Sequence, residues 1–293
     1  MISNPNEPVG VSGDPPHYAT EVIDLEYHRH GGAPLLARVY RPLGPGPFPA
    51  MVDVHGGGWT SGTRLQNAVI CEALAAAGIV VAALDFRMPP EARYPASVAD
   101  VNWGIRWLKA NASRFRGRSD LVGGIGSSSG AHQLLLAALR PHDERYRAFA
   151  DPGESSAEAT LDFIVACWPV ADPLQRYRMA QRRGAEILLR NHGAYWPDEQ
   201  AMEDGNPQRI VERGETRRLP PLLVLQGTRD DNLPPDMAAR FAAAWRQAGG
   251  LAQLEEFEGQ PHAFITKDPA SAASTRALDL IKSFVARQVA AIA

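Results

Sequence analysis

The sequence predicts an α/β fold, with a mostly parallel central sheet and helices on both of its faces. Apolar runs typical of strands alternate along the chain with stretches whose apolar residues recur at the helical period. The interior runs, such as Ile79–Phe86 and Leu222–Gln226, are almost continuously apolar, as expected of strands that helices cover on both sides. With 293 residues and 45% hydrophobic content, the chain can bury one large core, so we expect a single domain over residues 1–293.

The predicted elements follow in order from the N-terminus. Residues 1–21 are rich in proline, glycine and asparagine, and we expect them to form an N-terminal arm. The predicted strands that follow are Leu35–Tyr40, Ala50–Val54, Ile79–Phe86, Leu121–Ile125, Phe163–Trp168, Leu222–Gln226 and Gln253–Phe257. Apolar stripes at helical spacing predict helices around Val98–Leu108, Ala131–Leu139, Met237–Trp245 and Leu278–Ile292.

Residues 172–207 break this alternation. They lie between two predicted strands, are too long for a single crossover helix, and are rich in arginine and aromatic residues. We expect them to form an insertion over the edge of the sheet that serves as a lid. Its five arginines are best explained as a solvated helix face, with contact to an anionic substrate as the alternative: Arg176, Arg178, Arg182, Arg183 and Arg190.

Composition and charge exclude several classes of protein. A formal net charge of −3 gives no reason to expect binding to nucleic acid or to an anionic membrane. No apolar run is long enough to span a membrane, and the first residues lack the basic start and apolar run of a signal peptide. Cys71 and Cys167 lie in apolar surroundings and are interpreted as buried free thiols. We therefore expect a cytoplasmic protein, with the oligomeric state left open and a homodimer among the options.

The stretch "GIGSSSGAHQLLL", Gly124 to Leu136, holds three serines between a strand and a helix. A flexible linker would not sit directly before a strong helical stripe, and neither phosphate-binding motif fits, since the third glycine of G-x-G-x-x-G and the lysine of a P-loop are missing. The pattern G-x-S-x-G remains, in which a strained strand-to-helix turn presents the central serine. It identifies Ser128 as a candidate nucleophile.

A serine nucleophile needs a base and a group that orients the base. His262, in "EGQPHAF", follows the last predicted strand, and "QGTRDDN" places Asp230 and Asp231 directly after the strand before it. The chain order serine, acid, histidine is that of enzymes with this type of nucleophile turn. We take His262 as the base and Asp230 as the acid, with Asp231 as the other carboxylate that fits.

A glycine triplet completes the candidate site. In "VDVHGGGWTSG" it follows an early strand, and glycines allow backbone N–H groups to approach a developing oxyanion closely. We expect Gly56, Gly57 and the amide of Ser129 to donate to that oxyanion.

Taken together, "HGGGW", "GSSSG", "GTRDDNLP" and "PHAF" resemble the α/β-hydrolase superfamily, and the glycine triplet resembles that of the hormone-sensitive-lipase-like and feruloyl-esterase-like carboxylesterases. The resemblance runs from about Val22 to the C-terminus and implies an α/β-hydrolase fold. It implies Ser128 as nucleophile, His262 as general base and Asp230, the fourth residue of G-T-x-D, as orienting acid. It also implies that His55 anchors the glycine loop.

The function that this resemblance implies is hydrolysis of small or aromatic carboxylic esters through an acyl-enzyme. Hydrolysis of amides or formamides, as in the related kynurenine formamidases, stays open, and so does a non-catalytic ligand receptor. No metal-ligand spacing is present, and the chemistry needs no cofactor. Six aromatic residues could line the substrate pocket, although each could equally belong to the core: Trp59, Trp168, Tyr177, Tyr195, Trp196 and Phe264.

Overall fold

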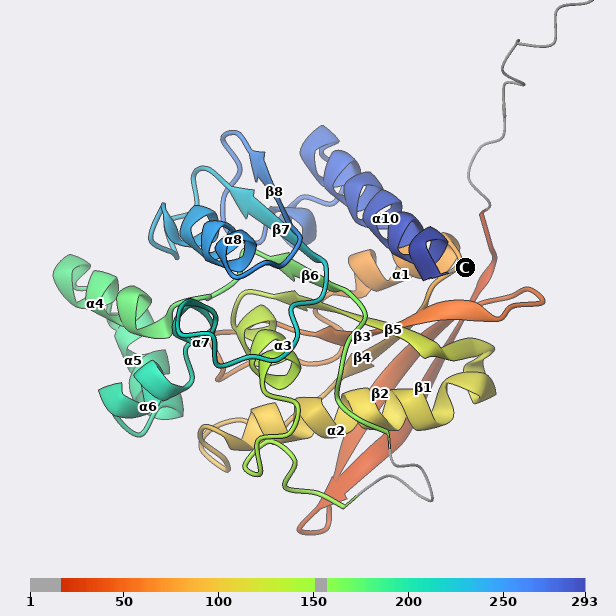
Figure 1. Ribbon diagram of the computed structural model, residues 1–293, viewed down its shortest axis with the longest axis horizontal. Helices are drawn as coiled ribbons and strands as arrows, with labels where there is room; N and C mark the ends of the chain where they lie inside the picture. The colour runs from red at the N-terminus through yellow and green to blue at the C-terminus, as the bar shows by residue number, and fades with distance from the viewer. Residues whose placement is uncertain (1–16, 151–156, 293) are drawn as a thin grey trace, which may run out of the picture.

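One mixed sheet of eight strands runs through the computed structural model, in the order β1-β2-β4-β3-β5-β6-β7-β8 (Figure 1). The structure describes residues 17–150 and 157–292. Antiparallel pairing is confined to one edge, where β1 (Thr20–His30) pairs with β2 (Ala33–Pro42) and β2 pairs with β4 (Val80–Leu84). The remaining pairs are parallel and involve β3 (Phe48–Val54), β5 (Gly117–Ser127), β6 (Ile164–Cys167), β7 (Leu222–Gly227) and β8 (Ala252–Phe257).

Each of the seven strands predicted from the sequence is present, and β1 is an eighth that the apolar runs did not indicate. Most of its residues are exposed or half-buried, because it lies at the edge of the sheet and alternates polar with apolar residues. The strand begins at Thr20, so residues 20 and 21 of the predicted arm belong to the sheet. Just before it, the Tyr18 amide donates to the carbonyl of Ala76. Residues 1–16 of the predicted arm lie outside the described residues.

Helices cover both faces of the sheet (Figure 1). On one face α1 (Ala68–Ala76) packs against β2 and β4, and α10 (Ala272–Ile292) packs against α1. On the other face lie α2 (Ala96–Asn111), α3 (Ser129–Leu139) and α8 (Met237–Gln247). Every residue of β4 and β7 is buried between these layers, which explains their continuous apolar sequences. No helix in the described part of the chain has the length and apolar character needed to cross a bilayer.

Residues 172–207, called the insertion from here on, form three helices between β6 and β7: α4 (Pro173–Arg183), α5 (Glu186–Tyr195) and α6 (Glu199–Asp204). Figure 1 shows them grouped together at one end of the molecule. Asp172 caps α4 by accepting a 2.9 Å hydrogen bond from the Gln175 amide, and Asp198 caps α6 in the same way. Directly after the insertion, α7 (Pro207–Glu212) leads back towards the sheet.

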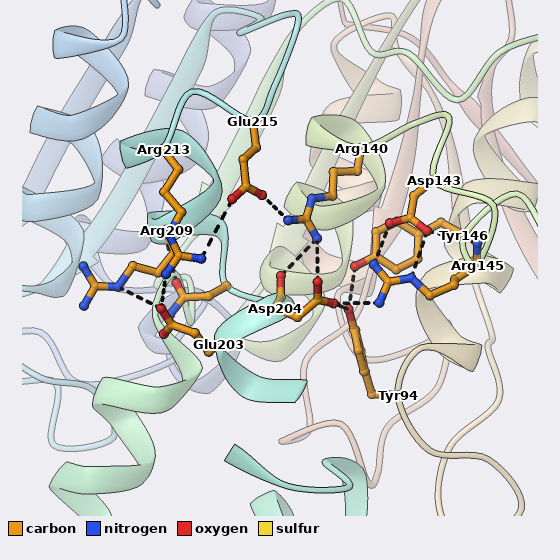
Figure 2. A network of polar contacts seen from close by, with 11 residues as sticks. Tyr94, Arg140, Asp143, Arg145, Tyr146, Glu203, Asp204, Arg209, Arg213 and Glu215 are labelled. Atoms are coloured by element: carbon orange, nitrogen blue, oxygen red, sulfur yellow. Dashed lines mark hydrogen bonds and ion pairs between the residues drawn. The ribbon is translucent and has the colours of Figure 1, made fainter. Parts of the chain in front are cut away.

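A polar network holds the end of the insertion to the body of the protein (Figure 2). Asp204, the last residue of α6, accepts hydrogen bonds from Tyr94 at 2.9 Å, Arg145 at 2.7 Å and Arg140 at 3.3 Å. The Tyr94 hydroxyl also lies 2.7 Å from that of Tyr146. Tyr94 precedes α2, and Arg140, Arg145 and Tyr146 directly follow α3, so the network fixes the C-terminal end of the insertion to the ends of these two helices.

Candidate active site

Ser128 occupies the turn between β5 and α3 and has an unusual backbone conformation, with φ 54° and ψ −119°. Such a conformation is strained for a non-glycine residue and persists only where the surroundings enforce it. The glycines of G-x-S-x-G leave room for this turn: a Cβ on Gly126 would lie 2.7 Å from the Ala131 Cα, and one on Gly130 would lie 2.1 Å from the carbonyl oxygen of Val54. The motif therefore has a steric explanation at both glycines.

The structure brings Ser128, His262 and Asp230 together. Nε2 of His262 lies 2.9 Å from Oγ of Ser128, and Nδ1 lies 2.7 Å from Oδ2 of Asp230. Because a carboxylate can only accept, Nδ1–H donates to Asp230 and Nε2 is left to accept the serine proton. Asp230 lies in the loop after β7 and His262 in the loop after β8. The alternative carboxylate, Asp231, is exposed, and its carbonyl oxygen accepts from Arg183 instead.

Asp230 is held in its ionised form by its hydrogen-bond partners. Burial by itself would raise the pKa of this carboxyl, but the hydrogen bond and charge of His262 act in the opposite direction. Gln226 Nε2 donates to Oδ2 at 2.9 Å and the Asn232 amide donates to Oδ1 at 2.8 Å. The net effect lowers the pKa below its ordinary value of 3.8, so the group is a carboxylate at neutral pH.

Backbone amides of the glycine loop face the same serine. A Cβ built on Gly56 would lie 3.2 Å from the Ser128 Cβ, which places this backbone directly beside Ser128. Gly57 has φ +111°, a conformation that favours glycine. The amides of Gly56, Gly57 and Ser129 have no hydrogen-bond acceptor among the described residues. The Trp59 amide donates to Oγ of Ser129 at 3.1 Å and ties the loop to the start of α3.

His55 is buried at the start of this loop. Its ring stacks on Phe86, with centroids 4.2 Å apart and planes 13° apart, and Nδ1 donates to the Gly56 carbonyl oxygen at 2.7 Å. Burial lowers the pKa of His55, so the ring is neutral at pH 7. These contacts anchor the loop and leave the ring outside the group around Ser128.

A cavity of about 270 Å³ opens onto Ser128 and His262. Its wall includes Gly56 to Gly58, neutral polar side chains such as Asn67 and Asn191, and the apolar residues Ile187 and Leu188 of α5. The insertion thus forms part of the wall. A larger cavity of about 430 Å³ lies elsewhere, around Arg140 at the end of α3, and contains none of the residues of the candidate site.

Of the six aromatic residues predicted to contact substrate, only Trp168 lies on the wall of this cavity. The other five pack elsewhere in the structure. Trp59 is 1% exposed, stacks on Tyr195 with planes 5° apart, and donates from Nε1 to Nδ1 of His132 at 3.1 Å. Tyr195, Trp196 and Phe264 are buried in the core, and Tyr177 packs beside His192. Through its contacts with Tyr195 and Trp196, Trp59 ties the insertion to the core.

Arg176 is the residue that the sequence analysis underestimated. It is 2% exposed and lies on the cavity wall, whereas Arg178, Arg182, Arg183 and Arg190 are exposed as a solvated helix face should be. Its neighbours Met179 and Ala180, three and four residues on, are buried as well. This i, i+3, i+4 spacing is the sequence signal that places Arg176 on the inner face of α4. Among the described residues, no group of three or more His, Cys, Asp or Glu is arranged to hold a metal ion.

Comparison with known proteins supports the resemblance seen in the sequence. A sequence model of the family described as BD-FAE matches residues 39–245. Esterase LipC of Mycobacterium tuberculosis is 31% identical over 237 residues, which cover 78% of this chain and 56% of that protein. The chain therefore spans little more than half the length of this curated relative.

Solved structures share the fold. A thermophilic esterase from Thermogutta terrifontis, with propionate bound, superposes with a TM-score of 0.71 at 24% identity, covering 95% of this chain and 97% of that one. An esterase from Pyrobaculum calidifontis gives a TM-score of 0.74 at 23% identity, covering 95% and 87%. The α/β-hydrolase fold predicted from the motifs is confirmed.

Proposed function

The chain belongs to the BD-FAE family of α/β-hydrolase carboxylesterases, and from this premise we propose that it is a serine hydrolase that cleaves small carboxylic esters through an acyl-enzyme on Ser128. The observation that carries the proposal is the continuous hydrogen-bond chain from Ser128 through His262 to Asp230, next to backbone amides with no acceptor of their own among the described residues. This is the arrangement that acyl transfer requires.

In the first half of the proposed reaction, Oγ of Ser128 attacks the ester carbonyl carbon while Nε2 of His262 takes the hydroxyl proton. Ionised Asp230 stabilises the imidazolium and keeps Nδ1 protonated. The imidazolium then gives its proton to the departing alkoxide, and the acyl group remains on Ser128. In the second half, water loses a proton to Nε2 of His262 and attacks the acyl carbon; the bond to Oγ then breaks, the imidazolium returns the proton to Oγ, and the carboxylic acid and free Ser128 result.

The amides of Gly56, Gly57 and Ser129 are proposed to stabilise the oxyanion that forms in both halves. Their support is their position beside Ser128, at the start of α3, where the positive end of the helix dipole also favours negative charge. One such donor typically contributes about 10²–10³-fold to turnover. The proposed reaction uses no cofactor.

We propose further that the insertion acts as a lid that covers the bound substrate. The support is that residues of both α4 and α5, namely Arg176, Ile187, Leu188 and Asn191, form part of the cavity wall. Water exclusion by such a cover strengthens the electrostatic interactions inside the site. The two buried free thiols, Cys71 and Cys167, support a reducing compartment such as the cytoplasm as the place of action.

A panel of substrates tests the activity. We expect hydrolysis of p-nitrophenyl acetate and butyrate and little turnover of aryl amides or N-formyl substrates of similar size. Covalent labelling by a fluorophosphonate probe should disappear in Ser128→Ala, whose turnover should fall about 10⁶-fold. The matched control is Ser283→Ala, which removes an exposed serine of α10 and should behave as wild type. Faster cleavage of formamides than of esters would favour the formamidase alternative, and a protein that never labels would favour a ligand receptor.

A further inference from the structure

The wall of the catalytic cavity carries a buried guanidinium. Arg176 donates from Nε to the carbonyl oxygen of Asn232 at 3.1 Å, from Nη2 to the Asn232 side-chain oxygen, and from Nη1 to Nε2 of His192 at 3.1 Å. Its Cζ lies over the ring of Trp59, 5.5 Å from the ring centroid. An arginine has five N–H donors, so these three bonds leave two without an acceptor among the described residues.

None of the contacts of Arg176 neutralises its charge. It forms no ion pair with a carboxylate of the described residues, and no Asp or Glu is among the described residues that line the cavity. The negative charge of Asp230 does act on Arg176, but the oxygens of this carboxylate already accept hydrogen bonds from His262, Gln226 and the Asn232 amide. The cavity therefore contains a fixed positive charge and no fixed negative charge on its wall.

The protonation states of Arg176 and its neighbour agree with this description. Burial lowers the pKa of Arg176 to about 10, so it stays protonated at neutral pH. Burial, together with the charge of Arg176, lowers the pKa of His192 to about 2, so that ring is neutral and accepts at Nε2. A buried cation with neutral partners only is costly for a folded protein, and an anion in the adjoining cavity would offset that cost.

We propose that Arg176 is a specificity residue and that the preferred substrates are esters bearing a carboxylate, which this guanidinium binds through its two remaining donors. The proposal rests on the esterase activity proposed above. A cavity of about 270 Å³ that contains both Ser128 and Arg176 admits only a short substrate. Half-esters of short dicarboxylic acids carry the charge on the acyl side, and hydroxybenzoates acylated on the phenolic oxygen carry it on the alcohol side.

A purely structural role for Arg176 makes a different prediction. Through Asn232, Arg176 braces the loop that carries Asp230, so its loss could lower the hydrolysis of every substrate alike. A carboxylate-binding role instead changes the ratio of kcat/KM for a charged ester to that for a neutral ester of the same shape. This ratio is independent of the fraction of active enzyme, so it separates the two roles even when a variant is poorly folded.

The experiment uses two isosteric pairs. The acyl arm compares monomethyl glutarate with its neutral amide, methyl 5-amino-5-oxopentanoate, and the alcohol arm compares 4-acetoxybenzoate with 4-acetoxybenzamide. Each pair is measured with wild type, Arg176→Met, Arg176→Lys and Arg182→Met, the last removing an exposed arginine of the same helix. In wild type we expect a charged-to-neutral ratio of about 10–100 in one arm, the range typical of a charge-assisted hydrogen bond. The ratio should fall to near one in Arg176→Met, keep an intermediate value in Arg176→Lys, and stay unchanged in Arg182→Met.

Two results would overturn the proposal: a wild-type ratio near one in both arms, or a high ratio that survives in Arg176→Met. If Arg176→Met yields no folded protein, the Arg176→Lys ratio decides, since it must fall below that of wild type. The proposed function fails separately, by the absence of hydrolysis of either member of both pairs and of the p-nitrophenyl esters.

Discussion

Replacing Asp53 by asparagine should make the stability of the protein less dependent on pH. Asp53 lies in β3 and is fully buried, with Oδ1 accepting a 2.8 Å hydrogen bond from Nδ2 of Asn67. Burial raises the pKa of its carboxyl from 3.8 to about 7, although the hydrogen bonds of Asn67 and Cys71 oppose the shift. The isosteric amide of Asp53→Asn keeps the shape and has no charge to titrate.

The sign follows from proton binding in the two states. Between pH 4 and 7 the folded state keeps the Asp53 proton and the unfolded state has lost it, so wild type loses stability as the pH rises. The shift from 3.8 to about 7, at about 1.4 kcal/mol per pKa unit, corresponds to about 4 kcal/mol over the whole window. Of this, about 2.5 kcal/mol falls between pH 5 and pH 8.

The assay is urea unfolding of wild type and Asp53→Asn at pH 5 and pH 8. We subtract the free energy of unfolding of wild type from that of Asp53→Asn at each pH. This difference should be about 2–3 kcal/mol larger at pH 8 than at pH 5, because wild type loses stability over this range and the variant does not. Asp120→Asn is the control. Its pairing with Arg118 lowers the pKa of Asp120 below 3.8, so this carboxyl is ionised in both the folded and the unfolded state between pH 5 and pH 8, and the difference between Asp120→Asn and wild type should be nearly the same at both pH values. A pH-independent difference between wild type and Asp53→Asn would refute the reasoning.

Three further variants test the geometry of the site. Asp230→Asn should lower kcat by roughly 10⁴-fold, because the imidazole loses the group that fixes its tautomer, whereas Asp231→Asn should leave kcat unchanged. Gly130→Ala should lower the free energy of unfolding, measured in urea, by more than about 4 kcal/mol, because the new Cβ would lie 2.1 Å from a backbone oxygen. Gly193→Ala is its control: the new Cβ would have no atom within 4 Å, so the variant should be as stable as wild type or slightly more stable. Trp59→Phe should lower the free energy of unfolding by about 1–3 kcal/mol, because the hydrogen bond of its indole nitrogen is lost; an unchanged midpoint would contradict its packing role.

The sequence predicted β8 and the strands that helices cover, and missed β1, the strand at the antiparallel edge of the sheet. Continuous apolar runs such as β7 reflect burial on both faces, a property of the residues themselves. In β1 only Tyr27 is buried and the other residues are exposed or half-buried, so its strand character depends on pairing with β2. That pairing is a tertiary fact that local pattern does not contain.

The residues around Ser128 were predictable for a topological reason. In a parallel sheet the loops that follow successive strands gather at one edge, so residues after β5, β7 and β8 meet there whatever the details of the loops. The direction of a single side chain is not fixed by that rule. Trp59 follows the glycine triplet and was expected to face the substrate, but it has φ 65° and its ring lies between Tyr195 and His132, away from the cavity.

Backbone strain at the site is supported by the sheet. Ser128 and Trp168, at the ends of β5 and β6, both have positive φ. The Ser128 amide donates to the Cys167 carbonyl oxygen at 2.9 Å, and the Trp168 amide donates to that of Leu225 at 2.6 Å, so each strained residue continues the hydrogen bonding of neighbouring strands. Ser128 is thus positioned by backbone that does not depend on the insertion. The wall above it, including Arg176, can therefore differ between proteins of this fold without moving Ser128, and for this reason the charge of the pocket has to be established from the individual structure.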